Sequence, residues 1–328
     1  MKVLGIGNAI VDVICKVKES FLSENKLTKG TMKLVDEVEF KKLLSSLKIE
    51  QTIAGGSVAN SIVGLSQLGN AVSFIGKVNN DELGNKYAKS LTNEKVKYCY
   101  KKKEEKIPTG TCLILITPDS ERTMVTFLGI AGKISDKDID ENAVKNSELI
   151  FLEGYLWDEG EPKTAFNKAI NISKKTAMSL SDQFCVDRHK KSFLDLVNSK
   201  LDITFANEQE ILSLINTKNF DEVISFGKNL GKLIVITRGE KGSIAIRKNE
   251  VVECGSKKNL KIVDLSGAGD LFAAGFLHGH VNKLSIRESL EKGTEMSSKI
   301  IQKIGARLNW YYLFFLLKLP LPFLGFTV

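Results

Sequence analysis

Short apolar runs that end in polar or glycine residues recur along this 328-residue chain, and helical patterns separate them. Such runs are typical of strands in a parallel sheet whose two faces are both covered by helices. The alternation predicts an α/β fold: a three-layer, Rossmann-like, doubly wound and mainly parallel sheet, whose ligands bind beyond the carboxyl ends of strands. The predicted strands are residues 3–6, 71–78, 148–154, 176–182, 202–207 and 233–239, with a helix at 58–69 and polar strand ends at Asp182, Asn207 and Gly239.

One segment departs from this alternation. Residues 109–129, TGTCLILITPDSERTMVTFLG, are two β-rich runs around a Pro-Asp-Ser turn, which predicts an antiparallel hairpin. Extended pieces at 11–18 and 30–35 could join it in a small second sheet. Such a sheet over the mouth of the main crevice would act as a lid, so we expect lid strands from about 11–36 and 107–129.

The end of the chain does not continue the pattern. Residues 309–328 are almost wholly apolar, and although their length permits a membrane span, Lys318, Pro320 and Pro322 argue against one. We expect one domain over residues 1–308, followed by a tail foreign to the fold, as a shift of reading frame would produce. A docked terminal segment and a membrane anchor stay open as alternatives.

Composition argues against several other classes of protein. Lysine supplies most of the 47 basic side chains and is spread along the chain, so the formal charge of +8 favours solubility over a nucleic-acid interface. The five cysteines are far apart and form no C-x-x-C pair, which argues against a disulfide framework or a zinc site. Asn8 and Asp12 interrupt the apolar start, which predicts a buried strand rather than a signal peptide. We therefore expect a cytoplasmic protein.

The stretch VDLSGAGDLFAAGF, residues 263–276, carries the most specific chemical signal. A strand ending near Asp264 leads through the small residues 266–269 into a helix that begins at about Asp270. Small residues let a ligand approach the backbone, and unpaired amides at a helix start favour negative charge. A transferring phosphoryl group would fit there, with Asp270 placed to take the proton of an attacking hydroxyl. The alternative is a tight structural turn with Asp270 as an ordinary first-turn acid.

Three further motifs are weaker when taken alone. AGGSVAN places Gly55 and Gly56 before a helix start and Asn60 one turn inside, which suits either a polar substrate or an ordinary capped helix. NEQE sets Asn207 and Glu210 at a strand end, where they could hold Mg²⁺ through water or simply begin a surface helix. TRGEKG follows a strand and offers open backbone to a nucleotide phosphate, and the chain has no P-loop pattern.

As a set, these motifs resemble a known family. The order GN-x3-D, GG-x3-N, FIGKVNNDELG, the hairpin, N-x-x-E, T-x-G-x-x-G and D-x-S-G-A-G-D resembles the ribokinase-like (PfkB) carbohydrate and nucleoside kinases over residues 1–308. PDSERTMVTFLG, LEGYLWD and SDQFCVDRH are similar to the bacterial branch usually labelled adenosine kinase. The resemblance implies a catalytic base at Asp270 and an anion hole for the migrating γ-phosphoryl at Gly267, Ala268 and Gly269.

The resemblance also implies where the ligands would bind. Hydroxyl groups of the acceptor would be held at Asn8, Asp12, Gly55, Gly56 and Asn60. Asn207 and Glu210 would organise Mg²⁺ and phosphate, while the ATP site would be lined by Thr237, Gly239 and Gly242. Asp264 and Ser266 match positions that in some relatives help to hold a monovalent cation, typically potassium.

The implied activity is an ATP-dependent kinase that phosphorylates the 5′-hydroxyl, or an equivalent primary alcohol, of a nucleoside or sugar, with adenosine as first choice. Its rivals are a ribokinase- or fructokinase-like sugar kinase and a non-catalytic nucleotide- or sugar-binding protein on the same fold. A nucleoside base would need an apolar shelf, for which Phe127, Trp157 and Phe184 are candidates. The expected cofactors are ATP and Mg²⁺, with K⁺ left open. The expected partner is a small molecule, not nucleic acid or a membrane, and a homodimer could pair through the lid.

Overall fold

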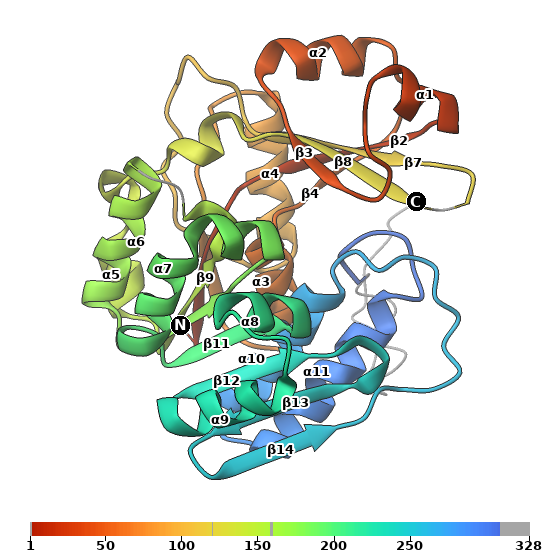
Figure 1. Ribbon diagram of the computed structural model, residues 1–328. Coiled ribbons are helices and arrows are strands. Elements are labelled where there is room, and N and C mark those ends of the chain that lie inside the picture. Colours follow the sequence, from red (N-terminus) through yellow and green to blue (C-terminus); the bar gives the residue numbers. More distant parts are fainter. Residues whose placement is uncertain (1, 120, 158–159, 309–328) are drawn as a thin grey trace, which may run out of the picture.

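The computed structural model describes residues 2–119, 121–157 and 160–308 (Figure 1). Its main body is a nine-stranded sheet in the order β14-β13-β12-β11-β10-β9-β1-β5-β6, in which neighbours from β6 to β12 pair in parallel and β13 and β14 pair antiparallel at one edge. The predicted mainly parallel sheet is confirmed. Its strands are β1 (Val3–Ile6), β5 (Val72–Ile75), β6 (Lys97–Tyr98), β9 (Leu149–Glu153), β10 (Thr176–Ser179), β11 (Ile203–Asn207), β12 (Leu233–Thr237), β13 (Ser243–Arg247) and β14 (Glu250–Cys254).

Helices cover both faces of this sheet, which makes three layers (Figure 1). Successive side chains of a strand point to opposite faces, so Val3 belongs to one hydrophobic core and Leu4 to the other. One core is covered by α3 (Ser57–Gln67), α4 (Glu82–Asn93), α10 (Ala268–Val281) and α11 (Ile286–Ile300). The other is covered by α5 (Glu141–Lys145), α6 (Glu161–Ile172), α7 (Gln183–Ser199), α8 (Glu208–Leu214) and α9 (Phe220–Leu230). Short 3-10 helices lie in the connecting segments: η1 (Gly129–Lys133), η2 (Asp136–Asp138), η3 (Gly154–Leu156) and η4 (Gly239–Lys241).

A second, five-stranded sheet has the order β3-β8-β7-β2-β4 and, after the predicted role, is called the lid. Its strands and helices are β2 (Val11–Lys16), β3 (Met32–Leu34), β4 (Ile49–Ala54), β7 (Thr111–Ile116), β8 (Arg122–Phe127), α1 (Glu19–Glu24) and α2 (Glu37–Ser45). The predicted hairpin is the antiparallel pair β7–β8. The prediction missed β4, so the lid draws on residues up to 54 rather than 36; most of this edge strand is exposed, and it therefore lacks the apolar alternation of a half-buried strand.

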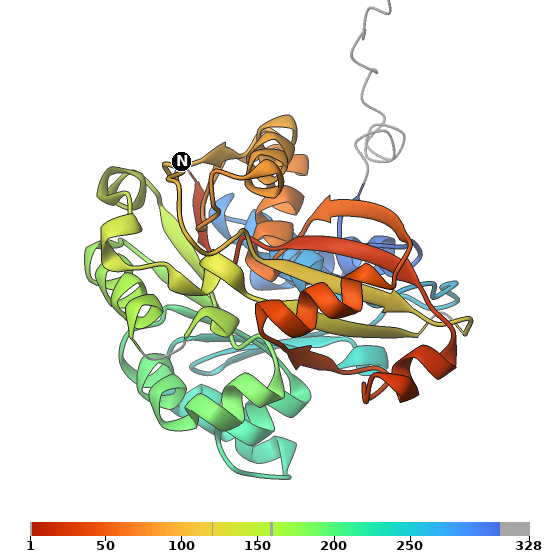
Figure 2. The ribbon, with the colours of Figure 1, turned by 90° about the horizontal axis from the view of Figure 1, so that it is seen from above.

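The lid lies over one end of the main sheet, with α1 and α2 on its outer side (Figures 1 and 2). Phe40 and Leu43 of α2 pack on Val13 and Leu115 in the outer core of the lid. The opposite face of the lid sheet points toward the main body.

Within the described ranges, none of the helices combines the length and the apolar character needed to span a bilayer. The tail at 309–328, to which the prediction of a foreign segment applies, lies outside the described residues.

Candidate active site

A cavity of about 530 Å³ lies between the main sheet and the lid. The main sheet supplies its floor from the carboxyl ends of parallel strands: Asn8 follows β1, Glu153 ends β9, Asn207 ends β11 and Thr237 ends β12. The first turns of α3 and α10 also line it. The cavity therefore occupies the position at which doubly wound sheets bind their ligands.

Asp270 lies in the first turn of α10 and its carboxylate faces α3. Ser57 Oγ donates a hydrogen bond to Asp270 Oδ1 at 2.6 Å, and Asn60 Nδ2 donates to Oδ2 at 3.0 Å. Burial raises the pKa of Asp270 to about 6, even though both hydrogen bonds and the charge of Arg307 lower it. The group is thus mostly ionised at neutral pH but basic enough to accept a proton, which suits a general base. An ordinary first-turn acid would instead face solvent.

The turn before Asp270 presents backbone amides to the cavity. Gly267 is the N-cap of α10, and the N–H of Leu271 donates to its carbonyl at 2.8 Å. The Ala268 N–H donates to Leu265 O at 3.2 Å, whereas within the described part of the chain the N–H groups of Gly267 and Gly269 have no backbone partner. No heavy atom lies within 4 Å of the point where a Cβ on Gly269 would stand. In this conformation Gly267 and Gly269, rather than Ala268, offer amides to an anion.

The two glycines before α3 let the backbone approach the acceptor residues closely. Gly56 has a φ of 94°, and a Cβ there would lie 2.2 Å from the carbonyl oxygen of Asn8. A Cβ on Gly55 would lie 2.3 Å from Asp12 Oδ2. Position 56 therefore requires glycine, whereas a side chain at position 55 would displace the Asp12 carboxylate. The structure places Gly55, Gly56, Asn8 and Asp12 beside one another.

A buried carboxylate that the sequence analysis did not single out orients Asn8. Glu153, which is 1% exposed, accepts hydrogen bonds from Asn8 Nδ2 at 3.0 Å, from Asn8 N at 3.3 Å and from Val58 N at 3.0 Å. With Asn8 Nδ2 committed to Glu153, Asn8 Oδ1 is buried and has no hydrogen-bond partner among the described residues. A cavity-lining acceptor without a donor indicates that a ligand hydroxyl or N–H completes it.

Asp12, on the lid strand β2, faces the same end of the cavity as Asp270. The pKa of Asp12 is raised to about 7, mainly by burial; the charges of Arg307 and Arg122 oppose this rise, and the charge of Asp270 adds to it. Two carboxyl groups and two guanidinium groups therefore share this part of the site. The arrangement can accept hydrogen bonds from the hydroxyl groups of a polyol.

Asn207 and Glu210 form a capping box at the start of α8. Asn207 Oδ1 accepts from Glu210 N at 2.8 Å, while the Glu210 carboxylate accepts from Asn207 N at 3.0 Å and Nδ2 at 2.5 Å. Both residues line the cavity, and burial raises the pKa of Glu210 to about 7. Within the described ranges, no group of three or more His, Cys, Asp or Glu side chains could hold a metal ion. The pair therefore fits a Mg²⁺ bound mainly by phosphates and water, which keeps several of its own waters.

The residues expected at a potassium site are engaged otherwise. The Asp264 carboxylate accepts from Ser266 N at 2.9 Å and from Gly305 N at 2.7 Å, and it forms an ion pair with Arg122 of the lid. Arg122 also donates to Ser266 Oγ at 2.8 Å. Because Asp264 is surrounded by donors and a guanidinium, Asp264 and Ser266 do not fit a monovalent cation in this arrangement.

Comparisons with known proteins agree with this geometry. The model of the family described as "pfkB family carbohydrate kinase" matches residues 31–311. The chain belongs to the pfkB family. The crystal structure of adenosine kinase from Sinorhizobium meliloti is 37% identical, with a TM-score of 0.88 over 94% of this chain and 95% of that one. A probable sugar kinase protein from Rhizobium etli is 34% identical, with a TM-score of 0.89 over 97% and 99% of the two chains.

Curated relatives are more distant, and their names give different acceptors. Adenosine kinase 2 from Arabidopsis thaliana is 26% identical over 92% of this chain and 94% of its own length. A 5-dehydro-2-deoxygluconokinase from Clostridium botulinum is 26% identical over 80% of this chain and 83% of its own length. Membership of the pfkB family makes the chain a carbohydrate or nucleoside kinase, which implies ATP as a substrate, and it leaves the acceptor to be inferred from the cavity.

Of the three residues predicted to line the ATP site, only one lines the cavity of this pfkB-family chain. Thr237 lines it, but Gly239 and Gly242 are not among its lining residues. Gly242 has a φ of 89° and a Cβ there would lie 2.1 Å from Cys254 O, so this glycine is required where the chain enters β13. Asp182, a predicted strand-end residue, caps α7 by accepting from Cys185 N at 2.7 Å.

None of the three aromatic shelf candidates lines the cavity. Phe127 packs on Phe40 in the outer core of the lid with ring centroids 6.0 Å apart, and Phe184 is 68% exposed. Trp157 is buried between Phe166 and Phe193. The cavity is lined by other aromatic residues, Tyr155, Phe205 and Phe272, which belong to the main body. On the lid side its apolar wall is aliphatic and sulfur-containing: Ile10, Ile14, Met32, Leu34, Ile53, Cys112, Ile114, Met124 and Leu128.

Four charged residues of the cavity escaped the sequence analysis: Glu153, Arg122, Arg188 and Arg307. Arg188 lies in the stretch SDQFCVDRH, on α7, but was given no role. Glu153 ends a predicted strand and could have been found by the strand-end argument applied to Asn207. Arg122 belongs to the predicted hairpin, but only its strand register shows that it points inward. Arg307 follows the last helix in a segment with no secondary-structure pattern.

Proposed function

We propose that the chain transfers the γ-phosphoryl group of ATP to the 5′-hydroxyl of a nucleoside, with adenosine as the first candidate. The observation that supports this proposal is that the cavity has a polar end and an apolar wall. Polar groups line one end, where Asn8, Asp12, Asn60 and Asp270 can bind hydroxyls, and the apolar inner face of the lid lies beside them. A nucleoside has the same division, since its ribose is hydroxylated and its base has apolar faces, whereas a free sugar has hydroxyls around its ring.

The proposed reaction follows from these positions. The acceptor hydroxyl lies against Asp270, which takes its proton as the oxygen attacks the γ-phosphorus. The amides of Gly267 and Gly269 stabilise the charge on the migrating group, and Arg122, 2.8 Å from Ser266 Oγ, lies close enough to add its charge. Asn207 and Glu210 would hold Mg²⁺ through its water ligands when ATP is bound, and the ion would supply positive charge beside the phosphates. The closed lid keeps water from acting as the acceptor.

A sugar kinase is the second candidate, and one observation favours it. Among the described residues, the lid face of the cavity carries no aromatic ring on which a purine could stack, and the aromatic residues that line the cavity, Tyr155, Phe205 and Phe272, all belong to the main body. The Rhizobium etli relative is named a probable sugar kinase. A non-catalytic binding protein is disfavoured because Asp270 and the glycine turn are both in place.

The direct test is ATP consumption by the full chain with adenosine, inosine, ribose and fructose, each with Mg²⁺. Turnover with a nucleoside, and at least about tenfold less with ribose, is the expected result. If only a free sugar is phosphorylated, the proposed acceptor is wrong and the acceptor is a sugar, while the proposed mechanism stands. ATP binding without turnover of any of the four would favour the binding protein.

Two further expectations remain proposals. A cytoplasmic location is supported by the five free cysteines. A homodimer through the lid is supported by β4, an edge strand whose residues 49–52 are exposed and whose backbone is open to pairing.

A further inference from the structure

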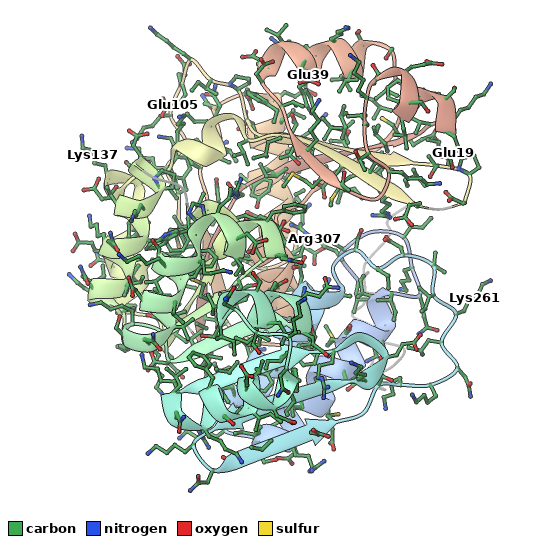
Figure 3. All side chains as sticks on the ribbon, in the orientation of Figure 1. Glu19, Glu39, Glu105, Lys137, Lys261 and Arg307 are labelled. Atoms are coloured by element: carbon green, nitrogen blue, oxygen red, sulfur yellow. The ribbon has the colours of Figure 1, made fainter. Side chains whose placement is uncertain are left out.

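The segment that follows α11 returns to the active site. Ile301 O accepts from Val263 N at 2.8 Å and from Asp264 N at 3.1 Å. Gly305 N donates to Asp264 Oδ2 at 2.7 Å, and Leu308 O accepts from Gln67 Nε2 at 2.6 Å. These bonds hold the chain on both sides of Arg307, which lines the cavity and lies near the centre of the molecule, below the lid (Figure 3).

Arg307 donates in three directions. Its Nε donates to Asn60 Oδ1 at 2.9 Å, one terminal nitrogen approaches Gly55 O at 3.4 Å, and the other approaches Ser90 Oγ at 3.5 Å. The guanidinium thus links the loop before α3, the body of α3 and helix α4. Only the bond to Asn60 is short, so it is the strongest of the three.

The bond to Asn60 determines which way its amide faces. An amide has one accepting oxygen and one donating nitrogen. Because Arg307 can only donate, Asn60 must turn its oxygen toward Arg307, and its nitrogen then faces Asp270 Oδ2 at 3.0 Å. In the reversed orientation two donors would meet at Arg307 and two acceptors at Asp270.

Several charged or titratable groups surround this guanidinium and the carboxylate beyond it. Those that face Arg307 are Asp12 of β2, Tyr87 of α4, Glu94 after α4 and Asp270 of α10; Glu153 of β9 faces Asp270, and Arg122 of β8 faces Asp12. The charge of Arg307 lowers the pKa of both Asp12 and Asp270, opposing burial. Without Arg307, both carboxyl groups would be protonated at a higher pH.

We propose that Arg307 is a positioning residue of the phosphoryl-transfer site, which acts on Asp270 by fixing the orientation of Asn60 and by supplying a buried positive charge. The inference rests on the proposed kinase function. It adds to the proposed site a residue near the C-terminal end of the described chain, outside the sequence motifs. It predicts that loss of Arg307 impairs the chemical step and acceptor binding, while ATP binding at the other end of the cavity is maintained.

The test compares Arg307→Gln, Arg307→Lys and the wild-type full chain, with the acceptor that the wild type phosphorylates best. A matched control is Arg287→Gln, which removes an exposed arginine that donates to Glu253 O at 3.2 Å. Arg307→Gln should lower kcat/KM for the acceptor about 10- to 100-fold, leave KM for ATP within about threefold, and move the acid limb of the kcat–pH profile to higher pH. Arg307→Lys keeps the charge, so it should restore the acid limb but only part of the rate.

A double-mutant cycle with Asn60→Ala separates positioning from a general structural role. If Arg307 acts largely through Asn60, Arg307→Gln should cost less than about threefold in the Asn60→Ala background. Equal costs in both backgrounds with an unmoved acid limb would overturn the inference while leaving the kinase proposal intact. No turnover by the wild type would overturn both.

Discussion

Replacing Asp270 by Asn tests the proposed base most directly. The substitution keeps the shape of the side chain and removes its ability to take a proton. A positioned general base contributes about 10²- to 10⁴-fold to a rate, or about 3–5 kcal/mol of the barrier. We expect Asp270→Asn to lower kcat by that factor.

The structure indicates that this variant folds. The new amide can donate to Ser57 Oγ, because a hydroxyl also accepts, while its oxygen still accepts from Asn60 Nδ2. Both contacts of the wild-type carboxylate can thus be kept as hydrogen bonds, with Ser57 Oγ changing from donor to acceptor. The Asp140→Asn variant is a matched control, since Asp140 is also a helix-start aspartate, which accepts from Ala143 N at 3.0 Å on α5 and does not line the cavity.

The pH dependence of kcat gives a second, independent test of Asp270 as the base. With the Asp270 pKa at about 6, roughly 97% of the sites are ionised at pH 7.5 and roughly 9% at pH 5. The wild-type kcat should therefore fall about tenfold between pH 7.5 and pH 5, and the small residual rate of Asp270→Asn should not follow that limb.

The assay measures ADP release with saturating acceptor, and ATP binding is measured by calorimetry. We expect Asp270→Asn to bind ATP within about threefold of the wild type, since its change affects proton transfer and not nucleotide contacts. A kcat within about tenfold of the wild type, or an unchanged acid limb, would refute the assignment of Asp270 as the base.

Three other predictions concern the rest of the site. Asp12→Ala should raise KM for the acceptor at least about tenfold and KM for ATP little, because Asp12 lies on the lid strand at the hydroxyl-binding end; an equal loss of both would contradict this. Potassium should not raise kcat measurably over a sodium control, because Asp264 already pairs with Arg122, and a several-fold activation would show that this pair opens. Glu210→Gln should raise the Mg²⁺ concentration needed for half-maximal rate, measured by titration at fixed ATP, and no change would exclude Glu210 from the metal's hydration shell.

The parts of the site that the sequence predicted are those encoded locally. The glycine turn and Asp270 are neighbours in the chain, and a helix start after a strand presents its amides whatever the rest of the fold does. Asn207 was found for the same reason, since the end of a parallel strand fixes its position at the edge of the sheet.

The prediction of an aromatic shelf was wrong for Phe127 because alternate residues of a strand point to opposite faces of the sheet. Met124, Thr126 and Leu128 line the cavity, so Phe127, between two of them, must point to the outer core of the lid. The sequence predicts the two strands of the hairpin. It does not predict which face of the hairpin lines the cavity, because that depends on how the lid packs on the main body.

Arg307 could not have been predicted from local pattern. It meets Asn60 across a sequence separation of 247 residues, in a segment without helix or strand. Only the tertiary fold, which holds Leu308 at Gln67 and Gly305 at Asp264, brings it to the cavity.

The division of the hydroxyl-binding residues between the two sheets has a consequence for the order of events. Asn8 is held by Glu153 to the main sheet, while Asp12 lies on β2 in the lid. An acceptor that bonds to both joins two bodies, so its binding energy stabilises the closed arrangement over an open one. A poor acceptor that bonds only to Asn8 would not stabilise the closed arrangement of the lid. The protein would then distinguish acceptors by the fraction of molecules that close, as well as by the strength of the individual contacts.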